Sequence, residues 1–224
     1  MNSIPPLYEK LRELNERDYS KREYYWGTKQ ATLARLLSKE LPAKSTILDL
    51  GAGEGRNAVY LARQGHLVTA VDFAAQGMRK TENRAKKHKV SIDTVVANIA
   101  DKDFIAQIGT FDAIIAQHVL HFLTPEDANL VLGYMKEKIK PGGYAAIAAF
   151  RGIAKNPNFK RFENFELSNA FEVDGWKIHY YLIDVHPGKD GTPKPIVEIL
   201  AQKPKPVELP KSDVISDGPK PWDD

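Results

Sequence analysis

The residues with the clearest chemistry lie in residues 46–57, where an apolar run carries Asp49 and a turn of alternate glycines follows. Glycines let the backbone turn tightly and come close to a ligand, because no side chain fills the space. A helix predicted from Arg56 would point free N–H groups at the same place, which favours a carboxylate or a phosphate. The order of strand, glycine turn and helix therefore predicts a nucleotide-binding corner.

The spacing of the glycines narrows the kind of ligand. Gly51, Gly53 and Gly55 alternate, and Arg56 stands where a dinucleotide site has its last glycine. The Gly-Lys-Ser/Thr of a nucleoside triphosphate loop is absent. Asp72 closes the next predicted strand, where a carboxylate can accept hydrogen bonds from both hydroxyls of a ribose. Together with the acid of the corner, it frames a ligand with a sugar diol and a cationic centre, and we interpret the ligand as S-adenosylmethionine.

Strands and helices alternate along the middle of the chain. Apolar runs predict strands at residues 46–50, 66–72, 91–97, 111–116 and 144–150. Helices are predicted between them at residues 56–64, 74–89 and 101–108, and from the cap Thr124 to a break at residues 141–143. A short helix at 161–172 and two strands at 176–185 and 193–202 follow. The pattern predicts an α/β, doubly wound, Rossmann-like fold with a mostly parallel seven-stranded sheet and a C-terminal antiparallel hairpin.

The chain divides into three predicted segments. Residues 1–41 form N-terminal helices and a lid, residues 42–202 form the domain, and residues 203–224 are a proline-rich tail predicted to be disordered.

Two helices are predicted in the N-terminal segment. The first begins after Ser3, with Pro5 and Pro6 at its start, and carries leucines at helical spacing, and Thr28 is a predicted cap for the second. The leucines of the first helix are Leu7, Leu11 and Leu14, and those of the second are Leu33, Leu36, Leu37 and Leu41.

The aromatic and charged residues at 15–26 leave two interpretations open. They form either a surface connector whose rings pack on the core, or a lid whose Tyr24, Tyr25 or Trp26 contacts the ligand.

Composition limits the partners and the compartment. The chain has 32 basic and 29 acidic residues, a net charge of +3, so charge gives no argument for a nucleic-acid partner. It has no cysteine, and no close His/Asp/Glu cluster has the spacing of a metal site. No apolar run reaches membrane-spanning length and the N-terminus lacks a signal-peptide core. We expect a cytoplasmic enzyme, monomeric or homodimeric, that acts on a small molecule without a metal.

At this point the sequence resembles the class I S-adenosylmethionine-dependent methyltransferases over roughly residues 22–202, most closely their tellurite-resistance branch. The matching motifs are Ile47-Leu48-Asp49-Leu50-Gly51-Ala52-Gly53-Glu54-Gly55-Arg56-Asn57, Val71-Asp72, Phe111-Asp112-Ala113-Ile114-Ile115, Leu120-His121-Phe122-Leu123 and Lys140-Pro141-Gly142-Gly143-Tyr144. The resemblance implies the methyltransferase form of the Rossmann-like fold and methyl transfer from S-adenosylmethionine.

The resemblance also implies a role for individual positions. Gly51 and Gly53 would line the methionine and ribose portion, and Arg56 and Asn57 would lie beside the methionine carboxylate. The other implied contacts are Asp72 with the ribose, Phe73 with the adenine ring, Asn98 and Ile99 with the adenine edge, and Gln117 and His118 with the methionine end and the methyl group. Asn98 departs from the aspartate that the family more often has. Tyr25, Trp26 and Asp49 complete the expected cofactor contacts.

Histidines are the candidate bases. A base is needed only if the acceptor must lose a proton as it attacks the methyl group in line. His118 follows the fourth strand at the ligand-binding edge, and His186 lies in the hairpin turn, so both are predicted catalytic residues. His121, three residues after His118, is a weaker candidate for a ligand contact, and Pro187 stands where the tellurite branch tends to have a basic residue.

The acceptor atom is left open among oxygen, nitrogen, sulfur and a metalloid. The motif of nucleic-acid base methylation is missing, since Ala116-Gln117-His118-Val119 stands in its place. Two alternatives remain: a nicotinamide-dependent oxidoreductase on a Rossmann fold, and a non-catalytic module that binds S-adenosylmethionine.

Overall fold

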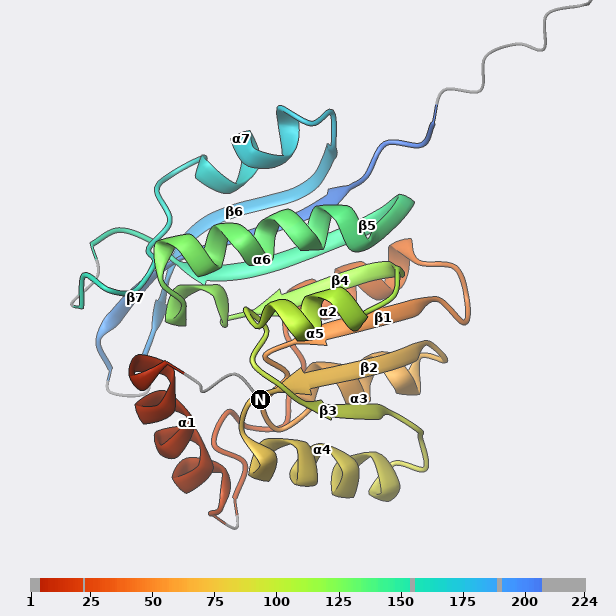
Figure 1. The fold of residues 1–224 in the computed structure, drawn as a ribbon. Helices are drawn as coiled ribbons and strands as arrows, with labels where there is room; N and C mark the ends of the chain where they lie inside the picture. The colour runs from red at the N-terminus through yellow and green to blue at the C-terminus, as the bar shows by residue number, and fades with distance from the viewer. Residues whose placement is uncertain (1–4, 22, 154–155, 189–190, 207–224) are drawn as a thin grey trace, which may run out of the picture.

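A seven-stranded mixed sheet forms the centre of the molecule (Figure 1). The computed structural model describes residues 5–21, 23–153, 156–188 and 191–206. The strands are β1 (Thr46–Leu50), β2 (Leu67–Asp72), β3 (Asp93–Val96), β4 (Phe111–Gln117), β5 (Ile139–Phe150), β6 (Lys177–Pro187) and β7 (Pro193–Gln202). Their order is β3-β2-β1-β4-β5-β7-β6. The first five strands are parallel and β7 is antiparallel to both β5 and β6, which confirms the predicted fold class and hairpin.

Helices cover both faces of the sheet. They are α1 (Pro6–Tyr19), α2 (Thr32–Glu40), α3 (Arg56–Arg63), α4 (Ala75–Lys87), α5 (Lys102–Gln107), the 3₁₀ helix η1 (Leu120–Phe122), α6 (Pro125–Lys138) and α7 (Glu166–Glu172). Residues of α2, α3 and α4 share one buried cluster with the sheet, and residues of α5, α6 and α7 share the other. Figure 1 shows α5 and α6 in front of the sheet and α2 and α3 behind it.

Strand β1 shows why the parallel strands are apolar at successive positions of the sequence. Ile47 belongs to the cluster under α2 and α3, whereas Leu48 and Leu50 belong to the cluster under α6. All three side chains are completely buried. A parallel strand covered on both faces needs apolar residues at every position, so the alternation of a half-exposed strand is lost.

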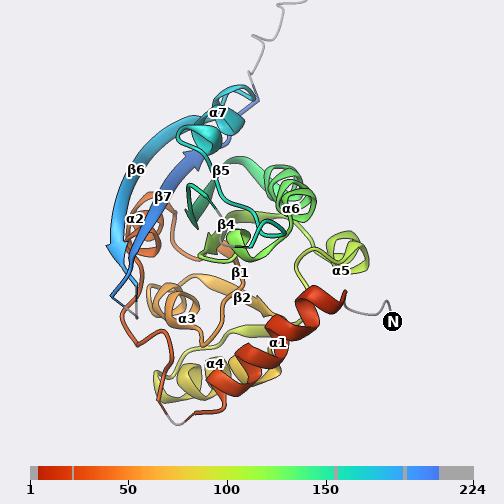
Figure 2. The same ribbon diagram turned by 90° about the vertical axis from the view of Figure 1, so that its left-hand side faces the viewer.

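Helix α1 lies across the edge at which β1, β2 and β4 end (Figure 2). Near its start, the Tyr8 hydroxyl donates to Asp127 at the beginning of α6. Near its end, the Glu16 carboxylate accepts the backbone N–H groups of Ala75 and Gln76, at 2.7 and 2.9 Å. A carboxylate satisfies the unpaired donors at the first turn of a helix, here α4. Helix α1 is thus fixed to a helix on each side of the sheet.

Several local predictions for the N-terminal segment were wrong. Thr28 does not cap α2, since the helix begins at Thr32 after Ala31, and the carbonyl of Thr28 instead accepts from Arg84. Helix α1 continues to Tyr19, into the segment predicted as a connector or lid. Leu14 is 38% exposed, whereas Tyr8 and Tyr19 are buried, because the helix turns its aromatic residues toward the sheet edge.

The predicted break at residues 141–143 lies inside β5. Phe111 pairs with Ile139 and Ala113 pairs with Tyr144. An advance of two residues along β4 therefore corresponds to an advance of five residues along β5. The proline and glycines bulge out of the ladder without ending the strand, which is how sheets accommodate them. The helix predicted at residues 161–172 is confined to Glu166–Glu172.

Two predictions concern the C-terminal tail and the start of the domain. Most of the predicted disordered tail, residues 207–224, lies outside the described residues. The boundary between residues 41 and 42 stays a prediction. In the described part of the chain, no helix combines the length and the apolar character needed to cross a bilayer.

Candidate functional site

A cavity opens at the carboxyl edge of β1, β2 and β4, beneath α1. Its lining includes most of the residues that the sequence singled out: Trp26, Asp49, Gly51, Gly53, Arg56, Asn57, Asp72, Phe73, Asn98, Ile99, Gln117 and His118. Tyr25 and His186, both predicted as site residues, are not among the residues that line it. The parallel strands bring the remaining residues together because their carboxyl ends share one edge.

The first glycine of the corner, Gly51, lies directly against the side chain of Val119. Gly51 has φ +66°, and a Cβ atom built there would lie 2.4 Å from Cγ2 of Val119. Val119 belongs to the segment after β4 and also lines the cavity. Glycine at this position therefore lets two loops approach each other at the edge of the site.

The Asp72 carboxylate is held by the backbone around it. One oxygen accepts from Gly53 N and the other from Ala74 N, each at 2.9 Å. Burial raises the pKa of Asp72 to about 6, and these hydrogen bonds oppose the rise. Each oxygen keeps a further lone pair, so the group can accept two more donors from a ligand in the cavity.

Three buried polar atoms of the cavity have no hydrogen-bond partner among the described residues. They are Oδ2 of Asp49, Oε1 of Gln117 and Nδ1 of His118. Burial raises the pKa of Asp49 to about 7, while the charge of Arg56 lowers it. Buried acceptors without partners are costly, so this set fits a ligand that brings hydrogen-bond donors and positive charge. The cationic amino acid portion of S-adenosylmethionine is such a ligand.

Gln117 is oriented by an acid that the sequence reading missed. Gln117, Ala148 and Glu198 are neighbours in register across β4, β5 and β7. Glu198 is 5% exposed and accepts side-chain hydrogen bonds from Gln117 and Tyr180. Because a carboxylate draws the amide N–H₂ of Gln117, the amide oxygen is the atom left for the cavity. The position of Glu198 within the apolar run of β7 was the feature of the sequence that could have indicated this role.

The segment between α1 and α2 is tied down by the glycine corner. Asn57 Oδ1 accepts from Ala31 N at 2.9 Å, and Arg56 Nη1 donates to the Trp26 carbonyl at 3.4 Å. Glu54, 3% exposed, accepts from Trp26 N at 3.1 Å and from Lys80 Nζ at 2.8 Å. Glu54 was not predicted as a site residue, because its partners are distant in the sequence.

His118 has unusual backbone geometry for a residue with a Cβ atom. Its φ is +58°, a conformation that clusters at functional sites. Burial, and next the charge of Arg56, lower the pKa of His118 to about 4. The ring is therefore neutral near pH 7, so that one of its nitrogens donates a hydrogen bond and the other accepts one.

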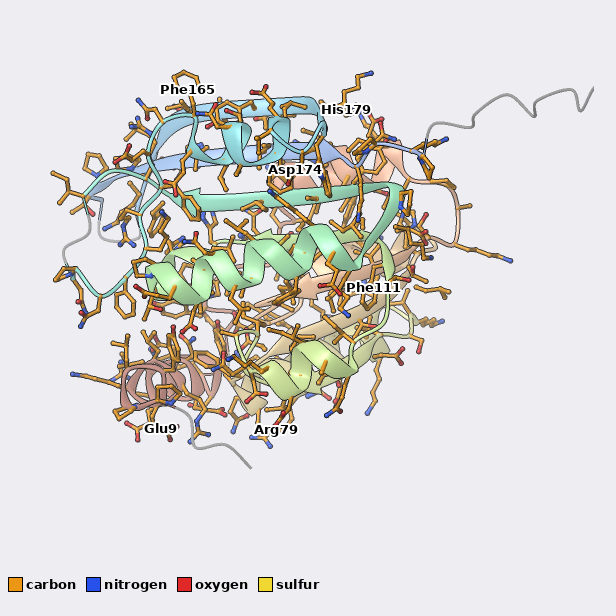
Figure 3. All side chains as sticks on the ribbon, turned by 45° about the horizontal axis from the view of Figure 1, so that its top comes forward. Glu9, Arg79, Phe111, Phe165, Asp174 and His179 are labelled. Atoms are coloured by element: carbon orange, nitrogen blue, oxygen red, sulfur yellow. The ribbon has the colours of Figure 1, made fainter. Side chains whose placement is uncertain are left out.

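The other predicted histidines lie outside the cavity lining. His186 is exposed on β6, with Nε2 3.3 Å from Asp184. His121 is buried: its Nδ1 accepts from Phe150 N at 3.1 Å and its ring stacks on Phe150. His179 of β6, which was not a predicted site residue, has its Nε2 3.0 Å from Gln202 Oε1, and Figure 3 shows it far from Glu9 of α1, the helix that covers the cavity. Among the described residues, no group of three or more histidines and acids is arranged to hold a metal.

Comparison with known proteins identifies a methyltransferase domain at residues 47–143. The chain is 29% identical over 135 residues to "Probable S-adenosyl-L-methionine-dependent methyltransferase TehB" of Haemophilus influenzae (strain Rd), covering 58% of this chain and 46% of the relative. It is 30% identical over 116 residues to the tRNA 5-carboxymethoxyuridine methyltransferase of Escherichia coli K12, covering 51% of this chain and 44% of the relative. The chain thus spans less than half the length of these curated relatives.

Solved structures support the same family. The crystal structure of TehB from Haemophilus influenzae matches with a TM-score of 0.70 at 25% identity, over 84% of this chain and 67% of that one. The 1,6-didemethyltoxoflavin-N1-methyltransferase of Burkholderia thailandensis matches in fold with a TM-score of 0.68 at 20% identity, over 92% and 93%. The match of residues 47–143 to the methyltransferase domain, the sheet order and the likeness to TehB in sequence and structure support a class I S-adenosylmethionine-dependent methyltransferase related to the TehB branch.

Proposed function

We propose that this protein transfers a methyl group from S-adenosylmethionine to a small-molecule acceptor. The observation that carries the proposal is the cavity that joins the oriented Asp72 carboxylate to three buried polar atoms that have no hydrogen-bond partner among the described residues. When bound, S-adenosylmethionine supplies a methyl group already activated on a sulfonium, which an acceptor lone pair displaces in line.

The ribose and adenine are assigned to the ends of β2 and β3. Asp72 would accept both ribose hydroxyls, with Phe73 beside the adenine ring. Asn98 Oδ1 accepts from Ala100 N at 3.0 Å, so the side-chain amino group is the part of Asn98 that remains for the adenine. Ile99 is 5% exposed and supplies an apolar contact at the same edge.

The methionine portion is assigned to β1 and the start of α3. Arg56 and the first N–H groups of α3 would bind the carboxylate, as helix N-termini bind anions. Asp49 would bind the amino group, which compensates its buried charge. Gly53 lets Tyr19 approach the corner, since a Cβ atom built there would lie 3.1 Å from the Tyr19 hydroxyl.

We favour the lid interpretation for the segment after α1. Trp26 lines the cavity, and its indole Nε1 donates to the Tyr19 hydroxyl at 3.2 Å. Tyr25 packs edge-on against Trp26, with ring centroids 4.9 Å apart, so Tyr25 would support the lid rather than contact the cofactor. Such a cover would exclude water from the transfer.

His118 is the residue we assign to the acceptor side. As a neutral imidazole it can accept a hydrogen bond from an acceptor that carries a proton and orient its lone pair. We favour a small acceptor because α1 covers the cavity and the net charge is only +3. His186 would need the hairpin to move toward the cavity before it could take part.

Isothermal titration calorimetry with S-adenosylmethionine, S-adenosylhomocysteine and NADH tests cofactor choice. We expect binding of the first two and none of NADH. A panel of acceptors with methyl-labelled S-adenosylmethionine then tests transfer. Cofactor binding without transfer to any acceptor would favour the non-catalytic alternative, whereas absence of cofactor binding would refute the proposal.

A further inference from the structure

A second cavity lies where β5 ends and β7 begins. Its lining includes Phe150, Arg151, Arg161 and residues 192–195. Arg151 N donates to the carbonyl of Pro195 at 3.0 Å, and Phe162 N donates to the carbonyl of Phe150 at 3.2 Å, so the backbone around the cavity is fixed by hydrogen bonds. The cavity is therefore built from β5, the segment after it and the start of β7.

Two guanidinium groups face this cavity without an acid to balance them. Neither Arg151 nor Arg161 has a carboxylate oxygen within 4.0 Å in the part of the chain that the structure describes. Arg161 Nη1 donates to the carbonyls of His121 and Lys160, at 2.9 and 2.8 Å. Arg151 Nη1 donates to Asn164 Oδ1 at 3.1 Å, while its Nε is buried and has no hydrogen-bond partner among the described residues. Their positions are thus set by neutral groups, and their charges remain available to an anion.

One aromatic side chain connects this cavity to the proposed methyl-transfer site. The guanidinium carbon of Arg161 lies 5.5 Å from the Phe150 ring centroid. The centroid of the His118 ring lies 5.6 Å from the same ring centroid, and His118 lines the cofactor cavity. Phe150 therefore lies next to a residue of each cavity, Arg161 of the second cavity and His118 of the first.

We infer that Arg151 and Arg161 form the anion-binding part of the acceptor site, so that the acceptor carries a carboxylate or a phosphate group. Planar guanidinium groups match the oxygens of both anions, and they bind them with charge-assisted hydrogen bonds. The inference rests on the proposed function for its link to methyl transfer. It adds the class of acceptor, which the cofactor cavity does not specify.

The test titrates inorganic phosphate and malonate into the full chain saturated with S-adenosylhomocysteine, followed by backbone amide NMR. Saturation fills the cofactor site, including Arg56, so an anion that still binds does so elsewhere. We expect saturable shifts of the amide signals of residues 150–153, Thr192 and Lys194, with the more tightly bound anion indicating a phosphorylated or a carboxylated acceptor. Arg151→Gln should weaken binding by about tenfold, because it removes a charge-assisted hydrogen bond.

Two further variants, used together with Arg151→Gln, distinguish an effect of charge on anion binding from an effect on the fold. Arg161→Lys keeps the charge but loses the planar fork, and we expect an intermediate affinity for the anion. Arg79→Gln removes an exposed arginine of α4 and should bind the anion like the wild type (Figure 3). S-adenosylhomocysteine affinity should stay within about twofold in all three, since the sites share no side chain that is changed.

The inference is overturned if neither anion binds saturably, if S-adenosylhomocysteine displaces the anion, or if Arg151→Gln binds it as tightly as the wild type. Failure of the wild type to bind S-adenosylhomocysteine would instead refute the proposed function. In that case the anion titration on the protein alone still reports on the arginine cavity.

Discussion

We expect the charge of Asp49 to lower the stability of the folded protein and to raise its affinity for the cofactor. The variant Asp49→Asn tests both effects. Asp49 is 1% exposed and its Oδ2 has no partner in the described structure. Burial raises its pKa from 3.8 to about 7. The unfolded chain therefore loses the proton of Asp49 more readily than the folded protein does, and ionisation favours unfolding.

The sign and the pH window follow from these two values. Below pH 3.8 the carboxyl is protonated in both states and contributes no penalty. As the pH rises from about 4 to 7, the folded protein loses stability, and above pH 7 the loss is complete. Each pKa unit corresponds to about 1.4 kcal/mol, so the full penalty is roughly 4 kcal/mol.

Asp49→Asn removes the ionisable group. The variant then has only the smaller cost of burying an uncharged amide in place of the carboxyl group. We expect the variant to be more stable than the wild type at pH 8 by about 2 kcal/mol, and less stable at pH 4 by about 1–2 kcal/mol. The measurement is urea unfolding of both proteins, without ligand, at the two pH values. Asp93→Asn, at an exposed residue of β3, controls for the loss of a surface charge.

Binding should change in the opposite direction from stability. In the proposed binding mode Asp49 pairs with the amino group of S-adenosylhomocysteine, so we expect the affinity of the variant at pH 8 to fall by about tenfold or more. If the stability difference between wild type and variant is the same at pH 4 and pH 8, the assignment of a buried, destabilising charge to Asp49 is wrong.

Three further substitutions test other contacts of the site. Asp72→Ala should weaken S-adenosylhomocysteine binding by about 2–3 kcal/mol in calorimetry, and unchanged affinity in a folded variant would exclude the ribose role. Gly51→Ala should destabilise the protein by about 1–3 kcal/mol in urea unfolding, because its φ is +66° and the new methyl would meet Val119; wild-type stability would contradict the observed loop packing. Glu54→Ala should destabilise the protein by about 2 kcal/mol and shift tryptophan emission to longer wavelength, since Trp26 loses its anchor. Lys21→Ala, which breaks an exposed ion pair, is the matched control, and an equal effect there would refute the special role of Glu54.

The sequence by itself determined the strand order along the chain and the glycine corner. Both depend on neighbouring residues: apolar runs such as residues 111–116 specify buried strands, and the turn from Asp49 through Gly55 specifies a strand followed by a helix. Asp72 was predictable because it follows the next strand at the same edge of a parallel sheet. Local pattern thus predicted the fold class and most of the cavity lining.

The tertiary structure decided which distant groups meet at that cavity. Helix α1 covers it because Tyr8 and Glu16 bond to α6 and α4, contacts that no local pattern contains. Glu198 orients Gln117 only because β7 pairs beside β5. His186 lies outside the cavity lining although it belongs to the expected hairpin, since it pairs with Lys194 where β6 lies beside β7. Hydrophobic periodicity specifies which face of an element is buried, whereas the partners of a buried polar group depend on contacts between residues far apart in the chain.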